Sequence, residues 1–177
     1  MKNAVRLALA LAALALAVPA AAQQQPRPTL GFGVSVAPIE NALLWPTFEL
    51  YLPIRLAPEF RLEPSLGIMS RDVNGGTDTR DITLGVGAFW VKPIAAPLDM
   101  YVGGRLKLNF AHSSGPAGSD SDTDVLLAAA LGSEYYVVPQ FSVGLEGQLG
   151  LYQHGAINGD DSGFYTAGLA FLRMYFH

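Results

Sequence analysis

Apolar residues alternate with small or polar residues through eight stretches of the chain, and this period of two predicts β-strands. In the fourth stretch, for example, Ile82, Leu84, Val86, Ala88 and Trp90 occupy every second position. No stretch keeps a sustained helical period. The eight predicted strands cover Thr29 to Val36, Thr47 to Leu56, Phe60 to Met69, Asp81 to Val91, Met100 to Phe110, Asp124 to Tyr136, Phe141 to Leu151 and Phe164 to Phe176.

The opposite face of the same strands carries small residues and charges. Glycines are frequent on it, and so are acids and bases in equal number. The ten charged residues that the strand phase assigns to this face are Glu49, Arg55, Arg61, Glu63, Arg105, Lys107, Asp124, Glu134, Glu146 and Arg173. Random placement would divide such charges between the two faces, so the pattern indicates a sheet with one apolar and one polar side.

The connections between the predicted strands alternate in length. Ala57 to Glu59, Lys92 to Asp99 and Val138 to Gln140 are short and contain proline. The longer links are rich in Gly, Ser and Asp, and they span Ala37 to Pro46, Ser70 to Arg80, Ala111 to Thr123 and Gln153 to Gly163. This alternation predicts an antiparallel up-and-down meander. Pro53 and Pro64 fall inside predicted strands, and we expect a bulge or a locally opened ladder there.

The N-terminal segment has the three-part plan of a secretory signal peptide. Lys2 and Arg6 precede an apolar run from Leu7 to Val18, and small residues follow Pro19. We therefore predict a signal peptide at 1–22, a flexible lead-in at 23–28 and one domain at 29–177. No wall-binding second domain is expected, because the predicted barrel fills the rest of the chain.

The composition narrows the class of protein further. Half of the 177 residues are hydrophobic and 15% are charged, against about 25% charged in an ordinary soluble domain. The absence of cysteine excludes disulfides and thiolate metal sites. The formal net charge of −4 argues against a nucleic-acid partner.

The direction of the apolar face separates a membrane barrel from a soluble one. Large aromatic residues lie near both ends of the apolar face, as in the interfacial girdles of membrane barrels. They are Trp45, Phe48, Phe110 and Phe164 near the long loops, and Phe60, Trp90, Tyr135, Phe141 and Phe176 near the short turns. We predict an all-β fold, a single eight-stranded antiparallel up-and-down transmembrane β-barrel in the bacterial outer membrane.

The chain resembles the small eight-stranded outer-membrane barrels of the OmpA/OmpX type. The signal peptide, the four hairpins and a final strand that ends in Phe176 and His177 carry the resemblance. It implies contact with outer-membrane lipid and lipopolysaccharide, and assembly by periplasmic chaperones and the barrel-assembly machinery. It names no specific loop partner. The family usually places the aromatic residue last, whereas Phe176 is penultimate here.

The polar face predicts what fills the barrel. Eight strands leave an interior about wide enough for side chains, so the charges are expected to form ion pairs in the lumen. Glu49, Arg105, Lys107 and Glu146 are expected at similar depth as one closed layer. The favoured function is a non-catalytic protein that supports the envelope or presents surface loops. Alternatives are a narrow channel or small-solute carrier, and a soluble lipocalin-like periplasmic carrier with its apolar face inward.

Two loop motifs suggest further chemistry. His112 and Ser114, with Asp124 as an acid, match the His-x-Ser spacing of outer-membrane lipid A deacylases, but Gly115 and Pro116 depart from that motif. A lipid hydrolase is therefore kept only as an alternative. The alternating acids from Asp120 to Asp124 begin like a calcium loop and lack its later ligands. No cofactor or metal is predicted.

Overall fold

Nine strand segments make up almost all of the computed structural model, which describes residues 29–40, 48–71, 78–115, 118–156 and 161–176. The predicted signal peptide and Trp45 lie outside the described residues. In chain order the segments are β1 Leu30–Glu40, β2 Phe48–Tyr51, β3 Ile54–Ala57, β4 Phe60–Arg71, β5 Asp78–Ala95, β6 Leu98–Gly115, β7 Gly118–Val138, β8 Phe141–Gln153 and β9 Ser162–Phe176.

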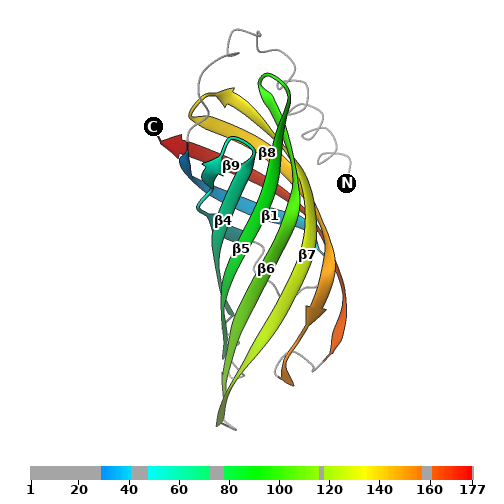
Figure 1. The fold of residues 1–177 in the computed structure, drawn as a ribbon. Helices are drawn as coiled ribbons and strands as arrows, with labels where there is room; N and C mark the ends of the chain where they lie inside the picture. Colours follow the sequence, from blue (N-terminus) through cyan, green and yellow to red (C-terminus); the bar gives the residue numbers. More distant parts are fainter. Residues whose placement is uncertain (1–28, 41–47, 72–77, 116–117, 157–160, 177) are drawn as a thin grey trace, which may run out of the picture.

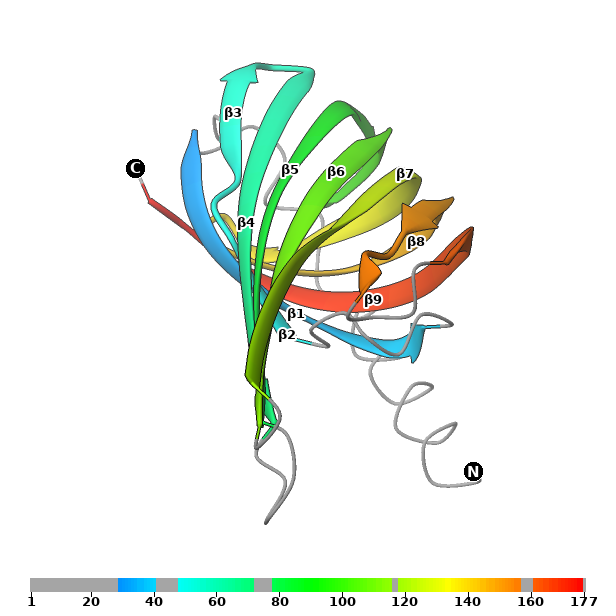
Figure 2. The same ribbon diagram turned by 90° about the horizontal axis from the view of Figure 1, so that it is seen from below.

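The strands close into an antiparallel barrel (Figures 1 and 2). Apart from β2 and β3, strands that follow one another in the chain pair with each other, and β1 pairs with β9, where Leu30 lies opposite Phe176 and Val34 opposite Leu172. β2 and β3 lie end to end between β1 and β4. They are two halves of one stave, so the predicted eight-stranded up-and-down barrel is confirmed.

Both internal prolines lie at the gap between β2 and β3: Pro53 is in the gap, and Pro64 lies opposite it on β4. β2 ends at Tyr51 and β3 begins at Ile54. The carbonyl of Pro53 accepts the N–H of Gly31, and the carbonyl of Pro64 accepts the N–H of Leu52, each at 2.9 Å. Neither proline can return a hydrogen bond, because proline has no N–H. The expected opening of the ladder occurs at Leu52 and Pro53, whereas β4 runs unbroken through Pro64 and has no bulge there.

The hairpins at the long-loop end extend further than the alternation predicts. The segment from Ala111 to Thr123, predicted as a loop, instead continues β6 to Gly115 and resumes in β7 at Gly118. In Figure 1 this hairpin is the lowest part of the molecule. Polar alternating residues such as Ser119 to Thr123 lack the apolar signal of a strand, but neighbouring strands hydrogen-bond them regardless of their side chains.

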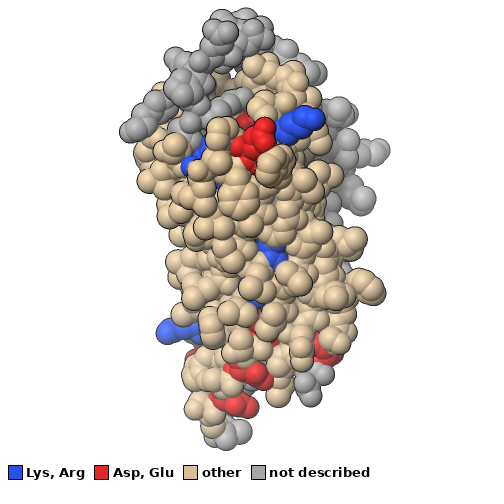
Figure 3. Space-filling model, viewed as in Figure 1, with Lys and Arg blue, Asp and Glu red and all other residues tan. Residues whose placement is uncertain are grey.

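The apolar face points outward. Leu84, Leu106, Leu145 and Leu172 are exposed on the outer wall, while alternate residues such as Phe89 are buried inside. Figure 3 shows that most charges on the visible face lie toward the two ends of the barrel. A soluble carrier with inward apolar residues is therefore the wrong alternative. Among the described residues, helices of a length and hydropathy sufficient to cross a membrane are absent.

Candidate functional site

Eight charged side chains fill the middle of the barrel interior, and we call them the central charge network. Alternation places them inward on six of the staves, and each residue is at most 3% exposed. The network consists of the acids Glu49, Glu63, Glu134 and Glu146 and the bases Arg61, Arg105, Lys107 and Arg173. Its formal charge is therefore zero.

Glu63 on β4 joins three arginines from three different strands. Its Oε1 lies 2.7 Å from Arg61 Nε and 2.7 Å from Arg173 Nη2, and its Oε2 accepts a hydrogen bond from Arg105 Nη2 at 2.9 Å. The carboxylate is fully buried. A single acid therefore links β4, β6 and β9 across the lumen.

Glu134 on β7 forms the second junction. Arg61 and Arg173 donate to its Oε2 at 2.5 and 2.8 Å. Its Oε1 accepts hydrogen bonds from the hydroxyls of Ser142 and Tyr175, both at 2.6 Å. Both oxygens are thus occupied, as a buried carboxylate requires.

Arg105 and Glu146 make the shortest direct bridge between β6 and β8. Arg105 donates from Nε and Nη2 to the two oxygens of Glu146, at 2.6 and 2.7 Å. This two-point geometry is the strong form of an arginine–carboxylate contact. Tyr101 and Gln148 also donate to Glu146, at 2.8 and 2.5 Å.

Lys107 and Glu49 form a separate pair rather than part of one layer with Arg105 and Glu146. Lys107 Nζ lies 2.5 Å from Glu49 Oε1, and the hydroxyl of Tyr51 donates to Glu49 Oε2 at 2.5 Å. The pair meets the rest of the network through Tyr51, whose ring centre lies 4.8 Å from the Arg105 guanidinium. The single layer expected from the sequence is therefore two groups.

Inward aromatic rings pack against the arginines of the network, and sequence reasoning missed these rings. Arg61 lies 4.5 Å from the ring centre of Tyr101, Arg105 lies 4.7 Å from that of Phe89, and Arg173 lies 3.9 Å from that of Phe171. These are cation–π distances. The signal was available in the strand phase, because all three rings fall on the polar face of their strands.

Small residues on the inner wall make room for the large ones. A β-carbon on Gly33 would lie 2.8 Å from Arg173 Cγ, and one on Gly87 would lie 2.9 Å from Arg105 Nη1. A β-carbon on Gly132 would meet the Tyr101 ring, and one on Gly144 would meet the Phe171 ring. Glycine thus gives the arginines and rings the volume they need in a narrow barrel.

Two of the predicted lumen charges lie away from the network, toward opposite ends. Arg55 donates at 3.4 Å to Asp99 and to the hydroxyl of Tyr136, near the short turns. Asp99 was not among the predicted lumen residues, because it fell in a predicted turn. Asp124 lies toward the long loops, where it accepts from Asn109 Nδ2 at 2.9 Å and from the N–H of Gly155 at 2.9 Å.

The described aromatic residues of the predicted girdles lie on the outer wall near the two ends. Phe48, Phe110 and Phe164 are exposed toward the long loops, and Trp90 and Phe176 toward the short turns. Phe60 lies opposite Trp90 in the sheet, while Tyr135 and Phe141 lie close to the β7–β8 turn. Phe60, Tyr135 and Phe141 are only partly exposed.

The residues of the suggested hydrolase do not come together. His112 is exposed, and its Nδ1 lies 2.9 Å from the hydroxyl of Ser121. Asp124 is buried inside the barrel, on the opposite face of the wall from His112. Ser114 lies across from Ser119 and Asp78 in the sheet.

The acidic residues before Asp124 accept hydrogen bonds from backbone N–H groups. Asp122 accepts hydrogen bonds from the N–H groups of Thr123 and Ala156, and Asp120 accepts one from Ser121. Within the described part of the chain, groups of three or more acids or histidines suited to a metal ion are absent.

Comparison with known proteins places the chain in a family. No curated protein sequence matches it. Among solved structures, the surface protein NspA of Neisseria is 18% identical, with a TM-score of 0.57 over 85% of this chain and 98% of that one. The N-terminal β-barrel domain of OprF from Pseudomonas aeruginosa is 16% identical, with a TM-score of 0.54 over 86% of this chain and 100% of that one.

The attachment invasion locus protein Ail of Yersinia pestis, in its complex with the heparin analogue sucrose octasulfate, is 16% identical with a TM-score of 0.52. The match covers 81% of this chain and 96% of that one. These likenesses show the fold. The family model described as "Outer membrane protein beta-barrel domain" matches residues 8–171. The chain therefore belongs to the outer-membrane β-barrel family and is a protein of the bacterial outer membrane.

Proposed function

We propose that this protein is a non-catalytic outer-membrane barrel with a closed lumen, which acts through its outer surfaces and loops. The observation that carries the proposal is the central charge network. Four acids and four bases from six staves pair directly with one another, at distances of 2.5 to 2.9 Å. A path for ions or solutes would have to break these pairs.

The energetics of burial support a permanent closure. A charge removed from water costs several kcal/mol unless partners replace its hydration, and removal of one partner of a buried pair costs about 3–5 kcal/mol. In this barrel Glu63 and Glu134 share the same two arginines, Arg61 and Arg173. Opening the lumen at this level would therefore disrupt several pairs at once.

The test is conductance in planar lipid bilayers. Purified, refolded protein is expected to give no steady ion current, while a general porin in the same bilayer conducts. The double variant Glu63→Ala/Arg105→Ala, which removes the acid and the base at the junction of β4 and β6, is expected to leak. Steady unitary currents from the parent protein would overturn the closed lumen and favour the narrow channel.

The long-loop end is the proposed contact surface. The β6–β7 hairpin extends beyond the rest of the wall, and Asp78, Asp120 and Asp161 are exposed at that end. Figure 3 shows acidic side chains there. Ail was solved with a sulfated sugar analogue, but an acidic hairpin repels such a polyanion. We therefore propose a neutral or cationic loop partner, together with contact to lipopolysaccharide and assembly by the barrel-assembly machinery.

A binding assay on whole cells tests the surface proposal. Cells that express the protein with an epitope inserted after Gly115 are expected to bind the matching antibody without permeabilisation. They are also expected to bind fluorescent heparin no better than cells without the protein. Antibody binding only after permeabilisation would reverse the orientation, and specific heparin binding would contradict the charge argument.

A further inference from the structure

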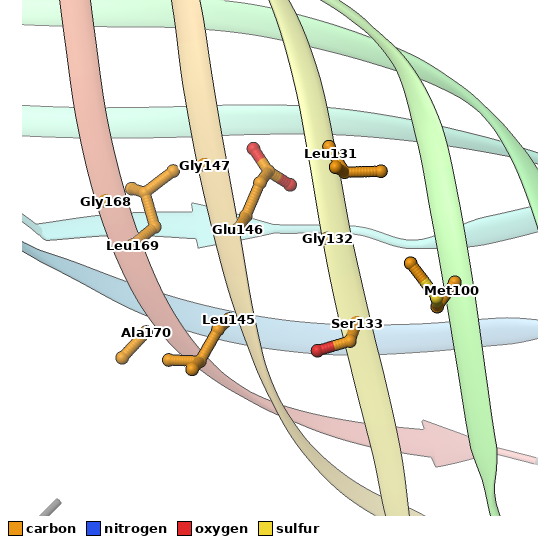
Figure 4. Close-up of a pocket in the computed structure, with 10 residues that line it drawn as sticks. All are labelled: Met100, Leu131, Gly132, Ser133, Leu145, Glu146, Gly147, Gly168, Leu169 and Ala170. Atoms are coloured by element: carbon orange, nitrogen blue, oxygen red, sulfur yellow. The ribbon is translucent and has the colours of Figure 1, made fainter.

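A groove runs across the outer wall between β6 and β9, and Figure 4 shows the residues that line it. Its volume is about 460 Å³. Two neighbouring rows of the sheet form it. Met100, Ser133, Leu145 and Ala170 lie side by side in one row, and Leu131, Gly147 and Gly168 lie side by side in the next.

Small residues line the middle of the groove, and exposed leucines border it. Leu145 is 65% exposed and Leu131 is 56% exposed, so both project from the wall. Between them Gly147 contributes no side chain. Ser133 supplies the one polar side chain that lines the groove from the outer face of these two rows.

Gly147 differs from the inward glycines in having no internal reason to be glycine. A β-carbon at Gly87 or Gly144 would collide with a neighbouring ring, whereas a β-carbon at Gly147 would meet nothing closer than the carbonyl oxygen of Leu131 at 4.0 Å. Glycine inside a strand weakens the strand, and often marks a place where a ligand or another chain approaches closely. Gly147 is exposed on the outer wall, so space for such an approach is open from the membrane side.

We propose that the groove holds one acyl chain of a phospholipid. The groove is continuous with the established lipid-facing wall of this outer-membrane protein, and hydrocarbon is what surrounds it there. A void against the wall would forfeit dispersion contacts that a flexible acyl chain supplies. Ser133 lies between Met100 and Leu145 in its row of the groove, and its hydroxyl can donate to an ester oxygen of the lipid.

The height of the groove along the barrel indicates which leaflet of the membrane it faces. Leu145 is four residues from the start of β8 at Phe141, which is about 13 Å along the strand and less in height because the strands tilt. The apolar band of such barrels is about 25 Å tall, and the short turns are periplasmic. The row that contains Leu145 therefore lies in the periplasmic half, which is the phospholipid leaflet rather than the lipopolysaccharide leaflet, and the row that contains Gly147 reaches the region of the midplane.

A second copy of the chain fits the groove poorly. Two convex barrel walls touch along a narrow strip, while a stable protein interface buries about 1,200 Å² or more. The projecting Leu131 and Leu145 would also keep two walls apart. A slender hydrocarbon chain can enter between the same side chains without such a conflict.

Native mass spectrometry of the folded barrel tests the proposal. The full chain is refolded in detergent and given dioleoyl phosphatidylethanolamine or purified lipid A. The parent is expected to retain one phospholipid. Gly147→Leu fills the groove and is expected to weaken retention at least ~10-fold, or about 1.4 kcal/mol. Ala170→Leu, on the other side of the groove, is expected to act in the same direction.

Gly104→Leu is the matched control. Gly104 also faces outward, lies outside the groove, and an added β-carbon there would lie 3.4 Å from the nearest atom, the carbonyl oxygen of Ala128. It is expected to retain the phospholipid like the parent, and a heat shift on electrophoresis verifies that each variant is folded. Equal retention by all variants, no retention by the parent, preference for lipid A, or a dimer that Gly147→Leu abolishes would each overturn the proposal.

Discussion

The inner and outer faces of the barrel wall come from the same strands, yet different interactions stabilise them. Inside, the carboxylate of Glu63 is fully buried and each of its interactions depends on a specific arginine. Outside, Leu106 and Leu127 lie side by side, exposed to lipid, and need only hydrocarbon around them. The comparison teaches that the inner face is specific and intolerant of change, while the outer face tolerates any apolar residue.

The largest effect is expected from Glu63→Ala. The substitution leaves Arg61, Arg105 and Arg173 short of one shared carboxylate in a buried site. The expected loss in free energy of unfolding is about 3–5 kcal/mol, measured by urea unfolding of the protein in lipid vesicles. Glu59→Ala, in the exposed β3–β4 turn, is the control and is expected to change little. A Glu63→Ala variant as stable as the parent would mean that water already screens these arginines.

On the outer face, a substitution is expected to lower the free energy of unfolding strongly only when it introduces a charge. Leu106 lies midway along the spanning part of β6, opposite Val86 and Leu127. Leu106→Arg is expected to cost about 2–4 kcal/mol in the same assay, because the charge would sit near the bilayer midplane. Leu106→Met should cost far less. Equal stability of the Arg and Met variants would show that this face does not meet lipid.

A smaller difference in unfolding free energy is expected between substitutions at two adjacent glycines, Gly103 and Gly104, which lie on opposite faces of the wall. A β-carbon on Gly103 would collide with the backbone carbonyl of Ala88, whereas one on Gly104 would lie 3.4 Å from its nearest neighbour. Gly103→Ala is expected to cost about 1–3 kcal/mol, as overpacking does. Gly104→Ala is expected to be neutral or to stabilise by up to about 1 kcal/mol. Equal unfolding free energies would remove the distinction between a crowded inside and an open outside.

The alternation of residue types was sufficient to predict the closed antiparallel barrel. It failed where polar strands continue past the membrane, as between Ala111 and Thr123, because hydrogen bonding to a neighbour leaves no hydrophobic signal. The break in the strand ladder at Pro53 could be predicted, because proline has no N–H to donate. The sequence did not reveal that β4 stays regular at Pro64, because that depends on Pro64 lying opposite the existing gap at Leu52.

The interior could be predicted as a set of residues but not as a set of pairs. Strand phase alone places Glu63 and Arg105 on the inner face. Which acid meets which base depends on the stagger of the strands around the barrel, and the sequence of a single strand does not determine this stagger. Glu49 thus forms an ion pair with Lys107 rather than with Arg105, and Asp99 joins Arg55 from a segment that had been interpreted as a turn.

Cysteine accessibility tests the closed lumen most directly, because the natural chain contains no cysteine. Ser142 is fully buried beside Glu134, and Ser119 is exposed on β7. Ser142→Cys in the refolded barrel should react with a small cationic thiosulfonate at least ~100-fold more slowly than Ser119→Cys, which corresponds to an opening free energy above about 2.7 kcal/mol. Similar rates at the two positions would show a water-filled lumen and contradict the account.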